Sequence, residues 1–200
     1  MLGTNCYIVM DPESKEGYII DPGADARRIL EAAGSMGLVC KGILCTHGHM
    51  DHVGAVGKVA ASTDADVYIA EQDTGVLTGS TLGARLGSLI VSKPRGVEYL
   101  HEGEHMHMGD TALKVLATPG HTPGSLSFLC QGELFCGDLV FEGSIGRTDL
   151  RGGSLSGLLG SVQREVFPLP DDTRIHPGHG PGTTVAREKA GNPFLRDLEV

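Results

Sequence analysis

The sequence predicts an α/β fold in which two mixed β-sheets pack face to face and helices cover their outer faces. Predicted strands are followed by predicted helices in the first half of the chain, and the same order returns in the second half. The chain has 200 residues, 40% hydrophobic and 20% charged, which is enough to bury a substantial core in one domain. Its 30 glycines and 10 prolines separate short periodic segments and indicate many tight turns.

The first half begins with a predicted β-hairpin, because the turn-rich stretch MDPESKEG separates two apolar segments, residues 5–9 and 17–20. A helix is expected over residues 26–36, where apolar residues fall at helical spacing between a possible cap, Asp25, and Gly37. This part therefore reads as strand, strand, helix.

A strand is predicted at KGILC, residues 41–45, which is short and apolar and ends at a cluster of histidines. A helical stripe restarts at Val53, and residues 67–70 predict a further strand. From residue 70 to residue 94 the chain is rich in Gly, Ser and Thr and poorly periodic, which suits a mobile loop over a site.

The second half is expected to form the second sheet. Four apolar, mostly strand-like segments predict its strands: residues 105–108, 112–117, 126–130 and 134–136. The chain is completed by a predicted helix, a strand and a short helix, which are residues 155–166, residues 173–176 and the segment after Thr183.

Charge and hydropathy exclude several classes of function. The net charge of −9 and the absence of a Lys/Arg block argue against a partner such as nucleic acid or an anionic membrane surface. No apolar segment is long enough to span a bilayer and no signal peptide is recognisable, so a cytoplasmic location is expected.

The five cysteines are odd in number, include no C-x-x-C pair and are expected to be reduced core residues, Cys45 and Cys136 among them.

The stretch CTHGHMDHVGA places four metal-capable side chains close together. His47 and His49 alternate around a glycine and project to one side, whereas Asp51 and His52 begin the next turn and point elsewhere. One loop can therefore serve two neighbouring metals. Imidazole and carboxylate are good zinc ligands, and the absence of thiolate favours a catalytic over a structural site. The alternative, a solvated loop without ligands, is disfavoured by the spacing.

THGHMDH resembles the H-x-H-x-D-H signature of metallo-β-lactamase-fold hydrolases, and TPGHTPGS, FCGDLVF and HPGHGPGT supply the remaining signature elements in the family's order. The resemblance implies a four-layer αββα sandwich and two divalent metal ions. It implies three ligands for a first metal, three for a second and one bridging ligand: His47, His49 and His121; Asp51, His52 and His179; and Asp138.

Such a site is suited to hydrolysis. Two divalent ions bring four positive charges, of which Asp51, Asp138 and a bridging hydroxide remove three, so a net positive charge remains to stabilise an oxyanion. Asp51 and Asp138 are accordingly the expected catalytic carboxylates. Zinc is the expected metal, although His/Asp sites also accept iron or manganese.

GSIGRTDLRGGS and the ending HPGHGPGTTVAREKAGNPFL resemble the compact branch of glyoxalase II, the hydroxyacylglutathione hydrolases. The resemblance implies hydrolysis of S-D-lactoylglutathione to D-lactate and glutathione by a metal-bridging hydroxide, with a small-molecule, glutathione-derived thioester as the expected partner. Arg147 matches a basic position that binds the glutathione part, and a guanidinium suits a carboxylate. A structural loop cation is the alternative interpretation of Arg147.

The sequence departs from that family in two places. Larger glyoxalase II enzymes carry a C-terminal helical domain that contacts glutathione, whereas this chain ends at NPFLRDLEV, so residues 1–200 are expected to form one domain without it. The chain begins at MLGTNCYIV, where relatives usually have an earlier strand, and the expectation is either a shortened start or a first sheet without that edge strand.

Rival functions share the fold. A persulfide dioxygenase would use one iron held by residues matching His47, His121 and Asp138, with open positions for dioxygen and thiol. A lactonase or β-lactamase is a further alternative, whereas a nuclease is disfavoured by the acidic charge. A non-catalytic binding protein has little need for an open site for two metals.

The remaining histidines and one aspartate are expected to play other roles. His101, His105 and His107 favour surface or loop positions, since His105 and His107 lie one strand-step apart without the carboxylate partner seen above. His176 is expected near the site without binding metal. Asp21, which ends an apolar strand, is either an acceptor for a ligand imidazole or a structural cap.

Overall fold

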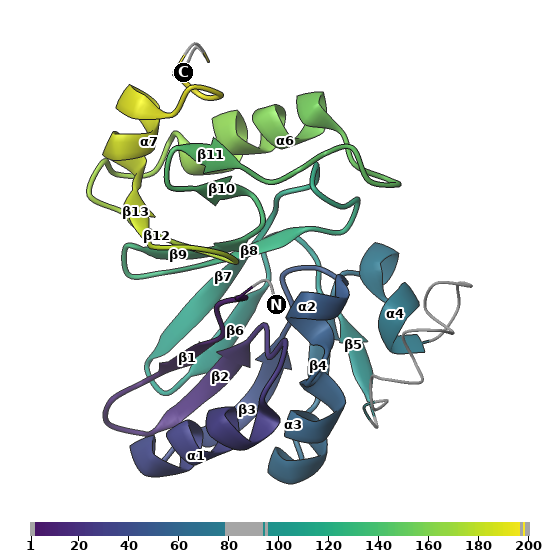
Figure 1. Ribbon diagram of the computed structural model, residues 1–200. Coiled ribbons are helices and arrows are strands. Elements are labelled where there is room, and N and C mark those ends of the chain that lie inside the picture. The colour runs from purple at the N-terminus through teal and green to yellow at the C-terminus, as the bar shows by residue number, and fades with distance from the viewer. Residues whose placement is uncertain (1–2, 79–93, 95, 197, 199–200) are drawn as a thin grey trace.

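A computed structural model of the chain describes residues 3–78, 94, 96–196 and 198. Helices cover the outer faces of two β-sheets, so the layers follow the order helix, sheet, sheet, helix (Figure 1). The predicted αββα architecture is confirmed. Among the described residues, no helix is both long enough and apolar enough to span a membrane.

The first sheet has five strands in the order β1-β2-β3-β4-β5. β1 and β2 form the predicted antiparallel hairpin, and β2, β3, β4 and β5 run parallel. The strands are β1 (Tyr7–Met10), β2 (Glu16–Ile20), β3 (Val39–Leu44), β4 (Val67–Ile69) and β5 (Val97–Tyr99). The carboxyl ends of β2, β3 and β4 therefore meet at one edge of the sheet.

The second sheet has six strands in the order β13-β12-β9-β8-β7-β6, in which β12 pairs with β9 in parallel and the other pairs are antiparallel. Its strands are β6 (His105–Met108), β7 (Thr111–Ala117), β8 (Leu126–Cys130), β9 (Glu133–Gly137), β12 (Arg174–Pro177) and β13 (Thr183–Thr184). A separate small hairpin follows β9 and consists of β10 (Val140–Phe141) and β11 (Ser144–Ile145).

The helices lie on the two outer faces, with α1 and α3 against the first sheet and α6 and α7 against the second (Figure 1). They are α1 (Ala26–Met36), α2 (Met50–Val53), α3 (Val56–Thr63), α4 (Gly75–Thr78), α6 (Leu155–Ser161) and α7 (Val185–Gly191), with a 3-10 turn η1 (Glu71–Asp73) and a π-helical turn η2 (Val162–Val166). α1 has the predicted bounds, because the Asp25 carboxylate accepts a hydrogen bond from the Arg28 amide and Gly37 ends the helix at φ 72°.

Side chains that alternate along the strands divide the core into a cluster between the two sheets and a cluster between each sheet and its helices. In β2, Tyr18 and Ile20 face the second sheet, whereas Ile19 faces α1 and α3. Phe128, on β8, is fully buried between the two sheets. Leu134 and Leu158 belong to a third cluster between the second sheet and its helices.

The main differences from the predicted elements concern short ones. β5, β10, β11 and β13 were not predicted, and each has only two or three residues. The predicted mobile loop at residues 70–94 contains η1 and α4 at its start. Most of that predicted loop, residues 79–93, lies outside the described residues.

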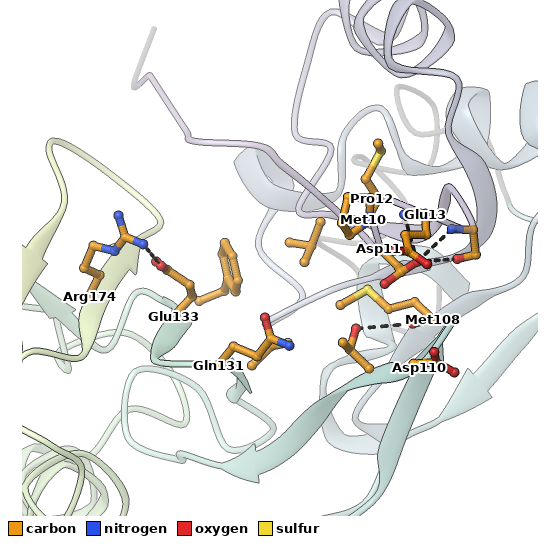
Figure 2. Close-up of a pocket in the computed structure, with 15 residues that line it drawn as sticks. Met10, Asp11, Pro12, Glu13, Met108, Asp110, Gln131, Glu133 and Arg174 are labelled. Atoms are coloured by element: carbon orange, nitrogen blue, oxygen red, sulfur yellow. Dashed lines mark hydrogen bonds and ion pairs between the residues drawn. The ribbon is translucent and has the colours of Figure 1, made fainter.

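A cavity of about 850 Å³ opens between the ends of the two sheets (Figure 2). It is lined by the β1–β2 turn, the β6–β7 turn and part of β8 and β9, including the ion pair of Arg174 and Glu133. None of the seven predicted metal ligands lines this cavity.

Candidate metal centre

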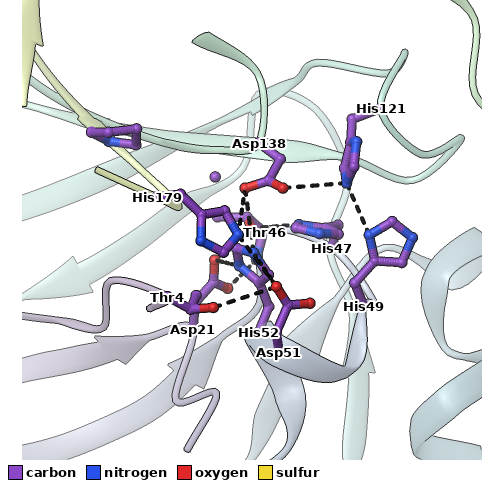
Figure 3. Close-up of polar contacts among 12 residues, drawn as sticks. Thr4, Asp21, Thr46, His47, His49, Asp51, His52, His121, Asp138 and His179 are labelled. Atoms are coloured by element: carbon purple, nitrogen blue, oxygen red, sulfur yellow. Dashed lines mark hydrogen bonds and ion pairs between the residues drawn. The ribbon is translucent and has the colours of Figure 1, made fainter. Parts of the chain in front are cut away.

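The seven predicted ligands come together where the carboxyl ends of the parallel strands in the first sheet meet loops of the second sheet (Figure 3). The first sheet contributes the segment after β3, with His47, His49, Asp51 and His52. The second sheet contributes the β7–β8 loop, the residue after β9 and the segment after β12, with His121, Asp138 and His179 respectively. Ligands commonly bind outside the carboxyl ends of parallel strands, which agrees with this placement.

His47, His49 and His121 form one compact group, whose possible ligand atoms all lie within 4.8 Å of one another. Nε2 of His121 is 2.9 Å from Nδ1 of His49, so the two rings present different nitrogens to the same point. His47 and His121 are buried. This is the predicted first ligand set, brought together by two loops that are 72 residues apart in sequence.

Asp51, His52 and His179 form a second group that also lies within 4.8 Å. Oδ2 of Asp51 is 3.3 Å from Nε2 of His179 and 4.0 Å from Nε2 of His52. His52 is fully buried, whereas the other two are partly exposed. The second predicted set is therefore also assembled, on the more open side of the site.

Asp138 lies between the two groups, with one carboxylate oxygen toward each (Figure 3). Its Oδ2 is 3.5 Å from Nε2 of His121, and its Oδ1 is 3.3 Å from Nε2 of His52 and 3.7 Å from Nε2 of His179. This is the arrangement that a bridging carboxylate requires.

Asp21 holds a ring from each group. Its Oδ2 is 2.8 Å from Nδ1 of His52 and also accepts a hydrogen bond of 2.6 Å from the Thr46 hydroxyl. Because that hydroxyl donates its proton to Asp21, it accepts from Nδ1 of His47 at 3.0 Å. Nε2 of the His47 and His52 rings is then free to face a metal ion. Asp21 thus contacts an imidazole of the predicted ligand set, as expected for an acceptor. The contact of Asp21 with His47 through the Thr46 hydroxyl was not predicted.

Backbone carbonyls hold two further rings. Nδ1 of His121 lies 2.7 Å from the carbonyl oxygen of Arg147, and Nδ1 of His179 lies 3.1 Å from that of Gly3. Four of the five imidazoles thus have their second nitrogen fixed, as is usual for histidines that bind metals.

Buried polar atoms show that a cation fits this site. Nε2 of His47, Nε2 of His52 and Oδ1 of Asp138 are buried and have no hydrogen-bond partner among the described residues. Leaving such groups unsatisfied is costly, and a divalent cation would satisfy all three. The donors are nitrogen and oxygen atoms, which suit zinc, iron or manganese.

The protonation of the site is set mainly by burial and by the carboxylates. Burial, together with the charges of neighbouring histidines, lowers the pKa of His47 and His49, so these rings are neutral. Burial would also lower the pKa of His52, but Asp21 and Asp138 outweigh it and raise that pKa to about 10. Metal binding to His52 must therefore displace a proton.

The guanidinium of Arg147 points into solvent. It makes two hydrogen bonds of 2.8 Å with Asp149, and 61% of its side chain is exposed. These hydrogen bonds lower the pKa of the Asp149 carboxyl to about 2. The observed contact of Arg147 with the centre is made by its carbonyl oxygen, and its predicted role in substrate binding stays a prediction.

The histidines that were predicted to play other roles lie outside both groups. His101 is exposed and pairs with Glu104 at 3.1 Å, and His105 and His107 are exposed on β6. His176 stacks on Phe135 and contacts Glu133 at 2.6 Å.

Asp73, beside the three-histidine group, was not predicted from the sequence either. Its buried carboxylate accepts hydrogen bonds from both loops that carry the three histidines. The strand order could have indicated that Asp73 lies near the site. Asp21, His47 and Asp73 each follow one of three adjacent parallel strands, whose carboxyl ends share an edge.

A second cavity, of about 760 Å³, reaches Asp51. It is lined by residues 3–8, by Gly23 and by the first turns of α1. A small molecule therefore has space beside the second group.

Residues 1–187 match the family described as the Metallo-beta-lactamase superfamily. The chain belongs to this superfamily.

Solved structures agree with this membership. The metallo-β-lactamase superfamily fold of the chain aligns with the structure of the BLEG-1 B3 metallo-β-lactamase at a TM-score of 0.84 and 37% identity, over 97% of this chain and 96% of that one. It aligns with TTHA1623 in a di-iron-bound form at a TM-score of 0.84 and 41% identity, with the same coverage of 97% and 96%.

A curated relative in the superfamily has a name that states a reaction. The chain is 35% identical, over 196 residues, to the hydroxyacylglutathione hydrolase GloC of Haemophilus influenzae, covering 96% of this chain and 92% of the relative. The family and this relative identify the chain as a metallo-hydrolase with the metallo-β-lactamase fold.

Proposed function

We propose that this metallo-hydrolase cleaves thioesters, and that its substrate is S-D-lactoylglutathione, which it converts to D-lactate and glutathione. The observation that carries the proposal is the pair of three-residue groups with Asp138 between them. The choice of a glutathione thioester is supported by the similarity to the hydrolase GloC.

In this proposal His47, His49 and His121 would hold one divalent ion, Asp51, His52 and His179 would hold the other, and Asp138 would serve both. Zinc is the proposed metal, with iron as the alternative because a similar protein is known in a di-iron-bound form. Divalent ions held there would supply a hydroxide nucleophile near neutral pH and polarise the thioester carbonyl.

The cysteines do not provide a competing nucleophile. Burial raises the pKa of all five thiols, and Cys45 and Cys136, which adjoin the site in sequence, are fully buried or nearly so. A protonated, buried thiol is a poor nucleophile. The proposed chemistry therefore relies on the carboxylates Asp51 and Asp138 and on the imidazoles.

Substrate binding is proposed to involve Arg147 and the cavity beside Asp51. Arg147 is exposed next to the loop that holds His121, and a substrate carboxylate would share its guanidinium with Asp149 or replace that residue. The cavity of about 760 Å³ supports a small-molecule substrate.

The test is release of free thiol from S-D-lactoylglutathione by zinc-loaded protein, with a simple alkyl thioester, a lactone and a cephalosporin measured in parallel. We expect kcat/KM for the glutathione thioester of about 10⁴ M⁻¹s⁻¹ or more, and at least about tenfold above the other substrates. Hydrolysis of only the lactone or only the cephalosporin would contradict the proposed substrate.

Persulfide dioxygenase activity is the alternative from another reaction class. Iron-loaded protein that consumes oxygen with glutathione persulfide, and releases no thiol from the thioester, would contradict the hydrolase proposal. Oxygen uptake is therefore measured on the same preparation.

A further inference from the structure

Asp73 is a buried carboxylate beside the centre, and 8% of it is exposed. It lies in η1, directly after β4. Its Oδ2 accepts a hydrogen bond of 3.1 Å from the Gly48 amide and one of 2.5 Å from the Thr122 hydroxyl, and its Oδ1 accepts one of 3.1 Å from the Gly124 amide. Hydrogen bonds to an ionised carboxylate are about twice as strong as neutral ones.

The three donors belong to the two loops that carry the three-histidine group. Gly48 stands between His47 and His49, and Thr122 directly follows His121. A single carboxylate thus connects the loop after β3 to the loop between β7 and β8. The same two loops are also joined by a backbone hydrogen bond of 2.8 Å from the Leu126 amide to the Thr46 carbonyl.

The contacts leave no space for a side chain between Asp73 and the loops. A Cβ atom on Gly48 would lie 2.1 Å from the carbonyl oxygen of Asp73, and one on Gly124 would lie 2.8 Å from its Oδ1. Both distances are shorter than real Cβ contacts. The two glycines therefore let both loop backbones approach the carboxylate directly.

His49 depends on this connection more than the other imidazoles do. His47, His52, His121 and His179 each have the second ring nitrogen held by a hydroxyl, a carboxylate or a carbonyl. Among the described residues, the His49 ring has a hydrogen-bonding contact with His121 alone. Its position is therefore set by its backbone, next to the Gly48 amide that Asp73 holds.

The other group is held by different residues. Asp51 and His52 lie in α2, and His52 is fixed by Asp21. His179 contacts the Gly3 carbonyl. No hydrogen bond joins Asp73 to these three residues within the described part of the chain.

We propose that Asp73 is a positioning residue that sets the geometry of the His47, His49 and His121 group, and that the Asp51, His52 and His179 group does not depend on it. Removal of the carboxylate frees the two loops to separate, which weakens metal binding at the first group alone. This inference concerns metal binding and holds for whichever substrate the centre acts on.

The test measures Co²⁺ binding to metal-free protein by calorimetry and visible absorption, in a background where one group is disabled. In His179→Ala the three-histidine group remains, and we expect Asp73→Asn to weaken its Co²⁺ affinity about 10- to 100-fold, with Asp73→Ala weaker still. In His121→Ala the other group remains, and the same substitutions should change its affinity less than about threefold.

Two further variants control for loss of folding. Glu71→Gln changes an exposed carboxylate in the same turn and should leave Co²⁺ affinity unchanged. Thr122→Val removes one of the three donors to Asp73, together with a contact to the Ser125 hydroxyl. It should weaken the three-histidine group in the same direction as Asp73→Asn but less, in protein that still unfolds cooperatively. If Asp73→Ala does not fold, the Co²⁺ affinity of Thr122→Val tests the proposed role of Asp73 in its place.

Two results would overturn the inference, and a third would count against it. One is equal weakening of both groups by Asp73→Asn, which would show that the residue acts on the fold as a whole. The other is unchanged affinity and an unchanged Co²⁺ spectrum of the three-histidine group in both Asp73→Asn and Thr122→Val. Failure of His179→Ala to bind Co²⁺ at all would also count against it.

Discussion

Nδ1 of His52 lies 2.8 Å from Oδ2 of Asp21, and both side chains are buried. The same oxygen accepts the Thr46 hydroxyl, which in turn contacts His47. One carboxylate at the end of β2 therefore orients a ring in each group, directly in one and through a hydroxyl in the other. This differs from Asp73, whose hydrogen bonds reach one group only.

Asp21→Asn is expected to weaken metal binding at both groups, by about 10- to 100-fold. The amide keeps one acceptor but loses the charge, and its NH₂ faces the Thr46 amide or hydroxyl. Calorimetric titration of metal-free protein with zinc measures the effect. Asp25→Asn is the control, since asparagine caps α1 as well as aspartate does. Wild-type affinity in Asp21→Asn would contradict the role assigned to Asp21.

Asp138→Ala is expected to remove a carboxylate that both groups share. Metal content should fall, and thiol release should drop by at least about 100-fold. Elemental analysis and the thiol assay are run on the same preparation. Glu142→Gln, four residues further along and paired with Arg187 on the surface, should behave as wild type. Unchanged turnover in Asp138→Ala would refute the proposed centre.

Arg147→Ala is expected to raise KM for the glutathione thioester by about three- to tenfold with little change in kcat, because an exposed cation that binds substrate before reaction contributes modestly. Metal content should not change, since His121 contacts the carbonyl and not the guanidinium. Arg151→Ala, an exposed residue on the same loop, is the control. An unchanged KM would count against substrate binding by Arg147.

The cysteines are expected to resist alkylation in the folded protein. Burial raises the pKa of the Cys6 and Cys136 thiols to about 12, so both are protonated at neutral pH. Labelling by iodoacetamide at about pH 8 should be at least about 100-fold slower than for a free thiol, and it should accelerate as pH rises. Peptide mass spectrometry locates the label, and denatured protein gives the reference rate. Rapid labelling of native Cys136 would contradict its buried position.

The seven predicted ligands were recognisable because their motifs are local. Each lies in a short segment whose spacing is visible in sequence, such as THGHMDH or TPGHTPGS. The helix α1 and the strand β6 were also predictable, since each has clear periodicity and clear ends. Two-residue strands such as β13 are too short to show a periodic pattern in the sequence. They form because a neighbouring strand pairs with them.

The residues that orient the ligands were harder to predict. Arg147 and Gly3 hold His121 and His179 through backbone carbonyls, which no side-chain pattern reveals. Asp73 lies in a turn whose composition resembles a loop, and its donors come from residues 25 to 51 positions away. Only the packing of the two sheets brings these groups together.

Two metals held by these residues are proposed to drive thioester hydrolysis, and the decisive measurement is thiol release from S-D-lactoylglutathione during titration of metal-free protein with zinc. Activity should rise until about two equivalents are bound per chain and then stay constant. Saturated zinc binding without thiol release would contradict this proposal.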